Sequence, residues 1–184
     1  MRKLKLQVQM TVDGFIGGPN GEMDWTEINW DDKLAKYVGG LTEPVDCIIL
    51  GRKLAQGFIP YWASHPEQPG ADKFNPTHKV VFTKTLEKSE WDNTVLAKGD
   101  LVDEIASLKN QAGGDMIAYG GATFVSALIK NGLIDEYHLF INPTAIGKGL
   151  SIFKELDGKQ KLKLVNSTAF DCGIVVLKYE PVRN

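Results

Sequence analysis

The feature that most constrains the fold is the apolar run at residues 45–50 (VDCIIL), which leads directly into Gly-Arg-Lys at 51–53. A strand with this composition is typical of a parallel sheet that helices cover on both faces. Comparable runs span 79–82 and 116–119. Helical patterns separate these runs, so their order predicts an α/β chain with a mostly parallel central sheet and helices on both faces.

The other segments extend this pattern over one expected domain, residues 1–184. Leu101, Ile105 and Leu108 recur at helical spacing behind Asp100, which predicts a capped helix. Four prolines predict an irregular excursion at 60–76. The remaining predicted strands are 4–12, 94–97, 136–141, 161–169 and 173–180, and the remaining helices begin near residues 31, 52 and 122. A turn joins the last two strands, which predicts an antiparallel C-terminal edge.

Composition and charge argue against several classes of partner. The chain has 21 Lys and Arg against 23 Asp and Glu, so we expect no broad basic surface for nucleic acid. Cys47 and Cys172 lack zinc-ligand spacing, and we expect no metal site. The sequence has neither an 18-residue apolar stretch nor a signal-peptide pattern, so we expect a cytoplasmic protein without a membrane partner.

Small or cationic residues follow three of the predicted strands. In a parallel sheet, ligands bind at the carboxyl ends of the strands, where the helices begin. Residues 51–53 offer backbone amides and cations to a phosphate, and Gly120-Gly121 permits close approach of a ligand. Ordinary strand–helix packing is the alternative at 120–121, and ordinary loop composition is the alternative at Thr83-Lys84. Asp31-Asp32 opens a predicted helix, as acids commonly do, with a catalytic acid as the alternative.

Taken in order, these junctions resemble the dihydrofolate reductase fold, a three-layer sandwich. They resemble in particular the C-terminal reductase domain of the riboflavin-pathway deaminase-reductase, as a stand-alone bacterial member. The resemblance covers nearly the whole chain. Its motifs are TVDGFIG at 11–17, ILGRK at 49–53, YGGATF at 119–124, GLIDE at 132–136 and PTAIGKG at 143–149. The resemblance implies NADPH as the cofactor.

The resemblance also implies roles for individual residues. The cofactor would contact Ile16, Gly51, Arg52, Lys53, Thr83, Lys84, Tyr119, Gly120, Gly121, Ala122, Thr123 and Phe124. Arg52 would lie by the adenosine ribose phosphate, and the glycine pair at 120–121 would carry a cis peptide. The substrate would contact Gln9, Trp25 and Phe58 beneath a mobile loop at 16–25. Asp31 or Asp32, with a slight preference for Asp32, would supply the proton, and burial would raise the pKa of Asp32.

The activity that the resemblance implies is hydride transfer from NADPH to a C=N-type bond. The substrate would be a small heterocycle, either pterin-like or ribosylaminopyrimidine-like. Two alternatives stay open, a non-catalytic NADP(H)-binding module and a domain that serves as an oligomer scaffold. Related domains pair through their C-terminal strands, so we expect a homodimer.

Overall fold

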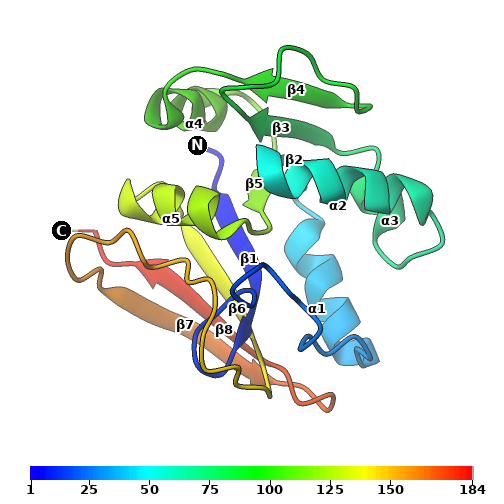
Figure 1. The fold of residues 1–184 in the computed structure, drawn as a ribbon, viewed down its shortest axis with the longest axis vertical. Coiled ribbons are helices and arrows are strands. Elements are labelled where there is room, and N and C mark those ends of the chain that lie inside the picture. The colour runs from blue at the N-terminus through cyan, green and yellow to red at the C-terminus, as the bar shows by residue number, and fades with distance from the viewer. Residues whose placement is uncertain (184) are drawn as a thin grey trace.

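A computed structural model describes residues 1–183 and contains one eight-stranded sheet of order β4-β3-β2-β5-β1-β6-β8-β7 (Figure 1). The strands are β1 (Leu4–Thr11), β2 (Val45–Gly51), β3 (His78–Phe82), β4 (Thr94–Ala97), β5 (Asp115–Ala118), β6 (Glu136–Asn142), β7 (Leu162–Ala169) and β8 (Val175–Pro181). Neighbouring strands are parallel across the first part of this order, from β4 through β3, β2, β5 and β1 to β6. Strands β8 and β7 then add an antiparallel edge. This arrangement confirms the predicted sheet.

Helices cover both faces of this sheet. They are α1 (Asp32–Thr42), α2 (Arg52–Ser64), α3 (Ala71–Phe74), α4 (Leu101–Asn110) and α5 (Ala122–Lys130). On one face, Ile105 of α4 and Leu128 of α5 share an apolar core with Leu6 of β1. On the other face, Leu34 of α1 and Ile59 of α2 form a second core. The result is the three-layer sandwich that the resemblance implies (Figure 1).

The central strand β1 alternates between apolar and polar residues, although both of its faces are covered. Its apolar residues, at 4, 6, 8 and 10, belong to the core beneath α4 and α5. Its polar residues lie on the face of α1, where Lys5 Nζ donates to the carbonyl oxygen of Leu41 at 3.2 Å. Lys5, Gln7 and Thr11 are all buried. Buried polar groups require hydrogen-bond partners. The buried polar side chains of β1 therefore indicate a place where a polar ligand can bind.

The segment at 60–76 differs from the predicted irregular excursion. Helix α2 continues through Pro60 to Ser64, and α3 follows at Ala71–Phe74. Tertiary packing explains the difference, because Phe58 and Trp62 on one side of α2 contact the ring of Phe74, with centroids 5.2 and 5.4 Å apart. Pro60 is exposed, so its ring lies away from this aromatic cluster.

Residues 1–183 contain neither a helix that could span a membrane nor a group of side chains that could bind a metal ion. No helix in this part of the chain is both long enough and apolar enough to cross a membrane. The same residues contain no group of three or more His, Cys, Asp or Glu side chains arranged to hold a metal ion.

A buried ionic cluster fixes the start of β6. Glu136, which is 4% exposed, accepts from Lys3 Nζ at 2.6 Å, Lys178 Nζ at 3.1 Å and His138 Nε2 at 3.3 Å. The hydrogen bond from His138, with those from the lysines, holds the pKa of Glu136 well below its usual range. Burial lowers the pKa of His138, whose Nδ1 lies 2.8 Å from the Tyr37 hydroxyl.

Glu136→Gln is expected to lower the free energy of unfolding at pH 7 by about 3 kcal/mol, because it removes one member of a buried ionic cluster. The pKa of Glu136 is depressed on folding, so its stabilisation is complete above its unfolded pKa of about 4.5 and is lost as the pH falls below that value. The variant should therefore lose less stability than the wild type between pH 5 and 3 (urea unfolding). Glu90→Gln, at an exposed position, is the control. Parallel pH curves for Glu136→Gln and wild type would contradict the prediction.

Candidate functional site

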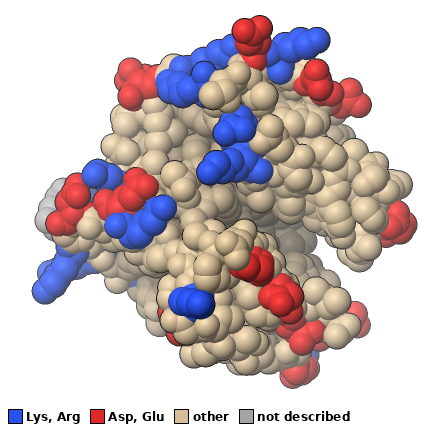
Figure 2. All heavy atoms as spheres, in the orientation of Figure 1, with Lys and Arg blue, Asp and Glu red and all other residues tan. Residues whose placement is uncertain are grey.

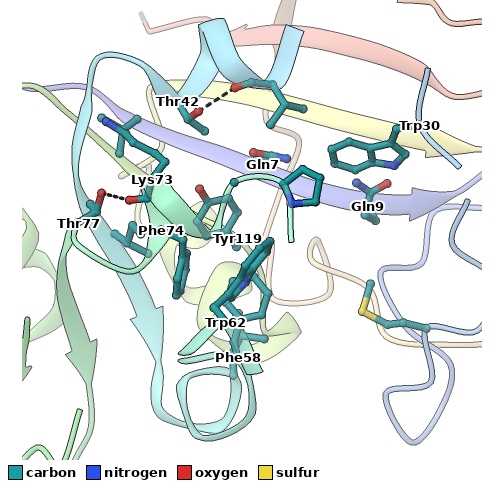
Figure 3. A pocket seen from close by; sticks show the side chains of 17 residues that line it. Gln7, Gln9, Trp30, Thr42, Phe58, Trp62, Lys73, Phe74, Thr77 and Tyr119 are labelled. Atoms are coloured by element: carbon teal, nitrogen blue, oxygen red, sulfur yellow. Dashed lines mark hydrogen bonds between the residues drawn. The ribbon is translucent and has the colours of Figure 1, made fainter. Parts of the chain in front are cut away.

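The site is a cavity of about 330 Å³ between α1, α2 and α3, above the polar face of β1. Figure 2 shows this face hollowed beside α2 and α3, and Figure 3 shows the side chains around the hollow. Two predicted substrate contacts, Gln9 and Phe58, line it. Trp25 is not among the lining residues; it is buried in its own loop, where Nε1 donates to the carbonyl oxygen of Glu22 at 3.0 Å.

Aromatic side chains form much of the cavity wall. Phe58 of α2 lies edge-on to Phe74 and is tilted against Tyr119, at centroid distances of 5.2 and 5.7 Å. Burial raises the pKa of the Tyr119 phenol, which therefore stays neutral at physiological pH. Trp30 stacks on Phe140 at the other end. These flat apolar surfaces suit a flat ring system.

Two glutamines of β1 contribute polar groups to the wall, which also includes Thr42, Lys73 and Thr77 (Figure 3). The Gln9 amide is oriented by Asn142, whose Nδ2 donates to Gln9 Oε1 at 2.8 Å. Gln7 is 7% exposed, and its Oε1 has no hydrogen-bond partner among the described residues. Trp62 Nε1 is likewise buried without a partner in residues 1–183. Both residues line the cavity, but these two unpartnered atoms are themselves fully buried and do not face its open space.

Two helix N-termini lie side by side next to this cavity. Gly51 ends β2 and caps α2, and Gly121 follows β5 and caps α5. They are close, because a Cβ on Gly51 would approach Phe124 Cβ to 2.7 Å. Arg52 and Lys53 open α2, and Arg52 Nη1 donates to Gln56 Oε1 at 3.1 Å. Figure 2 shows Lys and Arg side chains near the start of α2 in the middle of this face. Exposed backbone amides and cations together favour an anionic ligand.

The glycine pair before α5 has the unusual backbone that the resemblance implies, but not the cis peptide. Every peptide bond in residues 1–183 is trans, so that expectation is wrong here. Gly120 and Gly121 instead have φ of 149° and 81°. Positive φ at both glycines redirects the chain into the helix without a cis bond. Ala122 is buried, and Thr123 is exposed at the first turn of α5.

The residues after β3 are already bonded within the protein. The Thr83 hydroxyl accepts from the backbone N–H groups of Thr85 and Leu86 at 3.1 and 3.0 Å. Lys84 Nζ donates to the carbonyl oxygens of Lys98 and Gly99 at 2.6 and 2.7 Å. A cofactor role for Lys84 therefore requires that its ammonium group exchange at least one of these bonds.

The loop at 16–25 lies against the turn before 150. The N–H of Ile16 donates to Leu150 O at 2.9 Å, and the N–H of Leu150 donates to Gly17 O at 2.8 Å. Ile16 is buried in the same core as Met10. Met23 of this loop lines the cavity. The mobility of the loop stays a prediction.

The acidic pair lies at the start of α1 and outside the cavity wall. Asp31 is the N-cap: its carboxylate accepts from the N–H groups of Leu34 at 2.8 Å and Cys172 at 3.1 Å. The hydrogen bond from Leu34 lowers the pKa of Asp31. Asp32, for which burial was expected, is exposed, so that expectation is wrong.

Asp31→Ala is expected to lower the free energy of unfolding by about 1–2 kcal/mol, because α1 loses its cap. Asp31→Asn should stay within about 0.5 kcal/mol of wild type, since asparagine caps equally well. Chemical unfolding of both variants measures the difference. Equal destabilisation by the two substitutions would contradict the capping role.

Several residues of the cavity wall were not predicted from the sequence. Gln7 could have been found, because polar residues at every second position of a central covered strand are unusual. Trp62 and Phe74 gave no signal, since they lie in the proline-containing segment for which no helix was predicted.

Residues 2–176 match the RibD C-terminal domain family. Uncharacterized protein YyaP of Bacillus subtilis (strain 168) is 32% identical over 184 residues, which cover 97% of this chain and 94% of that protein.

Two solved structures are similar in fold. One is the diaminohydroxyphosphoribosylaminopyrimidine deaminase/5-amino-6-(5-phosphoribosylamino)uracil reductase of Thermotoga maritima, with a TM-score of 0.73 and 19% identity over 98% of this chain and 57% of that one. The other is dihydrofolate reductase from Enterococcus faecalis complexed with NADP(H), with a TM-score of 0.61 and 16% identity over 98% and 97%. With its match over residues 2–176, the chain belongs to the RibD C-terminal domain family and has the dihydrofolate reductase-like fold.

Proposed function

We propose that this protein is an NADPH-dependent reductase of a small heterocycle with a C=N-type bond, pterin-like or aminopyrimidine-like. The observation that carries the proposal is the pairing of an aromatic-walled cavity with two adjacent helix N-termini. Family membership supports it, as do the names of the similar proteins, a uracil reductase and a dihydrofolate reductase complexed with NADP(H).

The donors at the strand ends fit a dinucleotide. Backbone N–H groups of the first turns of α2 and α5 would bind its phosphates, and Arg52 and Lys53 would add positive charge. A Cβ on Gly120 would find only Leu54 Cδ2, at 3.9 Å, so a ligand can approach this backbone closely. NADPH would supply the hydride, and the cavity would orient the second ring and exclude water.

Proton delivery needs its own test, because no Asp or Glu lines the cavity as the structure describes it. Asp32 stays the candidate from the resemblance, and from its exposed position outside the cavity wall it would act through solvent. A loss in kcat of about 100-fold or more in Asp32→Asn would support this role. A kcat equal to that of wild type would remove it.

The whole proposal is tested with the wild-type protein, NADPH and a panel of pterins and aminopyrimidines. Trp30 and Trp62 line the cavity, so bound NADPH should change tryptophan fluorescence and raise the Tm. Substrate should then oxidise NADPH, which absorbance follows. No binding of NADPH would end the proposal. Binding without turnover of any acceptor would favour a non-catalytic NADP(H)-binding module, an alternative that the lack of a carboxylate in the described cavity wall already supports.

We propose in addition that two copies pair through the C-terminal edge of the sheet. Leu164 and Val165 of the edge strand β7 are 50% and 46% exposed. An edge strand with exposed apolar residues is a favourable surface for pairing. Sedimentation equilibrium should give a dimer, and Leu164→Lys should give a monomer.

A further inference from the structure

One hydroxyl group of the cavity wall is not used by the protein itself. Three hydroxyl side chains line the cavity, those of Thr42, Thr77 and Tyr119. Thr42 donates to the carbonyl oxygen of Val38 at 2.9 Å, and Thr77 donates to that of Lys73 at 2.6 Å (Figure 3). The Tyr119 hydroxyl makes no hydrogen bond to another side chain or carbonyl within residues 1–183, and burial alone perturbs its pKa.

The Tyr119 hydroxyl is open to the cavity. Gln7 Oε1 and Trp62 Nε1 also lack partners, but they are sealed within the protein. The Tyr119 oxygen is not among these sealed atoms, so it keeps accessible surface. Because Tyr119 lines the cavity and lies deep in the protein, that surface faces the cavity. Figure 3 shows the oxygen on the side of the ring away from Phe58 and Trp62.

Tyr119 also joins the cavity to the helix N-termini. It follows β5, and Gly120 and Gly121 come directly after it, before α5 begins. Phe58 and Phe74 contact its ring at centroid distances of 5.7 and 6.3 Å, which holds the ring in place. Tyr119 is therefore the cavity residue next in sequence to the backbone that we propose a dinucleotide approaches.

Reduction of a C=N bond is favoured by a hydrogen-bond donor at the nitrogen. As hydride forms a C–H bond at the carbon, the π electron pair of the C=N bond moves to the nitrogen, which then takes a proton. A donor fixed beside that nitrogen stabilises the charge as it develops. Burial raises the pKa of Tyr119, so its phenol keeps its proton at neutral pH and can donate.

We propose that Tyr119 is a catalytic residue whose hydroxyl donates a hydrogen bond to the substrate nitrogen that gains electrons when hydride reaches the adjoining carbon. The proton that completes the reduction comes from water, so Tyr119 is a neutral phenol before and after the reaction. This inference rests on the proposed function. The hydrogen bond itself forms on binding and can be measured without turnover.

Two flat ligands test the hydrogen bond. Pteridine-2,4-diamine has nitrogens in both rings, whereas quinazoline-2,4-diamine has the same diaminopyrimidine ring fused to an all-carbon ring. Each is titrated into protein saturated with NADP⁺ and labelled with 13C at tyrosine Cζ, whose chemical shift reports hydrogen bonding of the phenol. The pteridine should move the Tyr119 resonance, and the quinazoline should move it much less. Tyr119→Phe assigns the signal among the five tyrosines.

Tyr119→Phe removes the hydroxyl and keeps the ring. It should weaken binding of pteridine-2,4-diamine about three- to tenfold and leave binding of quinazoline-2,4-diamine within about twofold of wild type. With the panel acceptor that wild type reduces fastest, the variant should lower kcat about 100-fold or more while NADPH affinity is unchanged. Tyr61→Phe removes an exposed hydroxyl outside the cavity wall and is the matched control, expected to equal wild type throughout.

Equal thermal melting of the variants shows that folding is intact, and the wild-type resonance shift does not depend on any variant. The inference is overturned if pteridine-2,4-diamine leaves the Tyr119 resonance in place or if the quinazoline moves it equally. It is also overturned if NADP⁺ alone moves the resonance and the pteridine adds nothing, because the partner is then the cofactor.

The inference and the proposed function fail in different ways. A pteridine-dependent shift, with weaker pteridine binding in Tyr119→Phe but no NADPH oxidation by any acceptor, supports the hydrogen bond while the proposed reductase function fails. Turnover with the same kcat in wild type and Tyr119→Phe supports the reductase function and overturns the inference.

Discussion

Arg52→Ala should weaken NADPH binding by about 10- to 100-fold while NADH binding falls less than about threefold. The two cofactors differ by the phosphate on the adenosine ribose, and the resemblance places that phosphate at the start of α2. Arg52 stands in the first turn of that helix, and its bond to Gln56 leaves other guanidinium N–H groups for an anion. A charge-assisted hydrogen bond of this kind contributes roughly 1.5–3 kcal/mol.

Titration of tryptophan fluorescence with each cofactor measures the two dissociation constants. Lys154→Ala removes an exposed cation outside the cavity wall and is the control for general loss of positive charge. The difference between the cofactors should also shrink as salt is raised, because an exposed charge pair is screened. Equal loss of NADPH and NADH binding in Arg52→Ala would remove Arg52 from the phosphate role.

Gly121→Ala should reduce NADPH affinity by about 50-fold or more and lower the free energy of unfolding by only about 1–3 kcal/mol. The Cβ itself fits the protein, with Leu54 Cβ at 3.7 Å and Phe124 Cβ at 4.0 Å. The cost to stability comes from φ of 81°, which alanine adopts with strain. The cost to binding comes from a methyl group at the N-terminus of α5, where the dinucleotide must approach the backbone.

Gly132→Ala separates the two effects. Gly132 has φ of 64°, has nothing within 4 Å of an added Cβ, and lies beyond the other end of the same helix. The control should therefore lose similar stability and keep the NADPH affinity of wild type. Isothermal titration with thermal unfolding measures both quantities. Equal affinity loss in the two variants would show that strain in α5, and not contact with the cofactor, accounts for the effect.

Local patterns were sufficient for much of the fold. Residues 47–50 before Gly51 form the covered part of a parallel strand because their side chains are apolar on both faces. Asp100 caps α4 through the N–H groups of Val102 and Asp103, as its position before an apolar helical pattern predicts. The glycines at 120–121 have positive φ, although the bond between them is trans.

Other outcomes depended on packing that no local pattern contains. Pro60 lies inside a helix because the aromatic contacts of Phe58 and Trp62 with Phe74 hold the turns around it. The Asp31 carboxylate caps α1 through the N–H of Leu34, and it is also held by the N–H of Cys172, which is 141 positions away. Sequence spacing cannot distinguish a capping acid from a catalytic acid at the start of a helix.

The sequence by itself determined the order of strands and helices and the glycine and arginine junctions where a phosphate can bind, because periodicity, capping and backbone freedom are local properties. Only the tertiary structure decided which side chains form the cavity. Gln7 and Trp62 both line it, because β1 lies in the middle of the sheet and α2 crosses the same face.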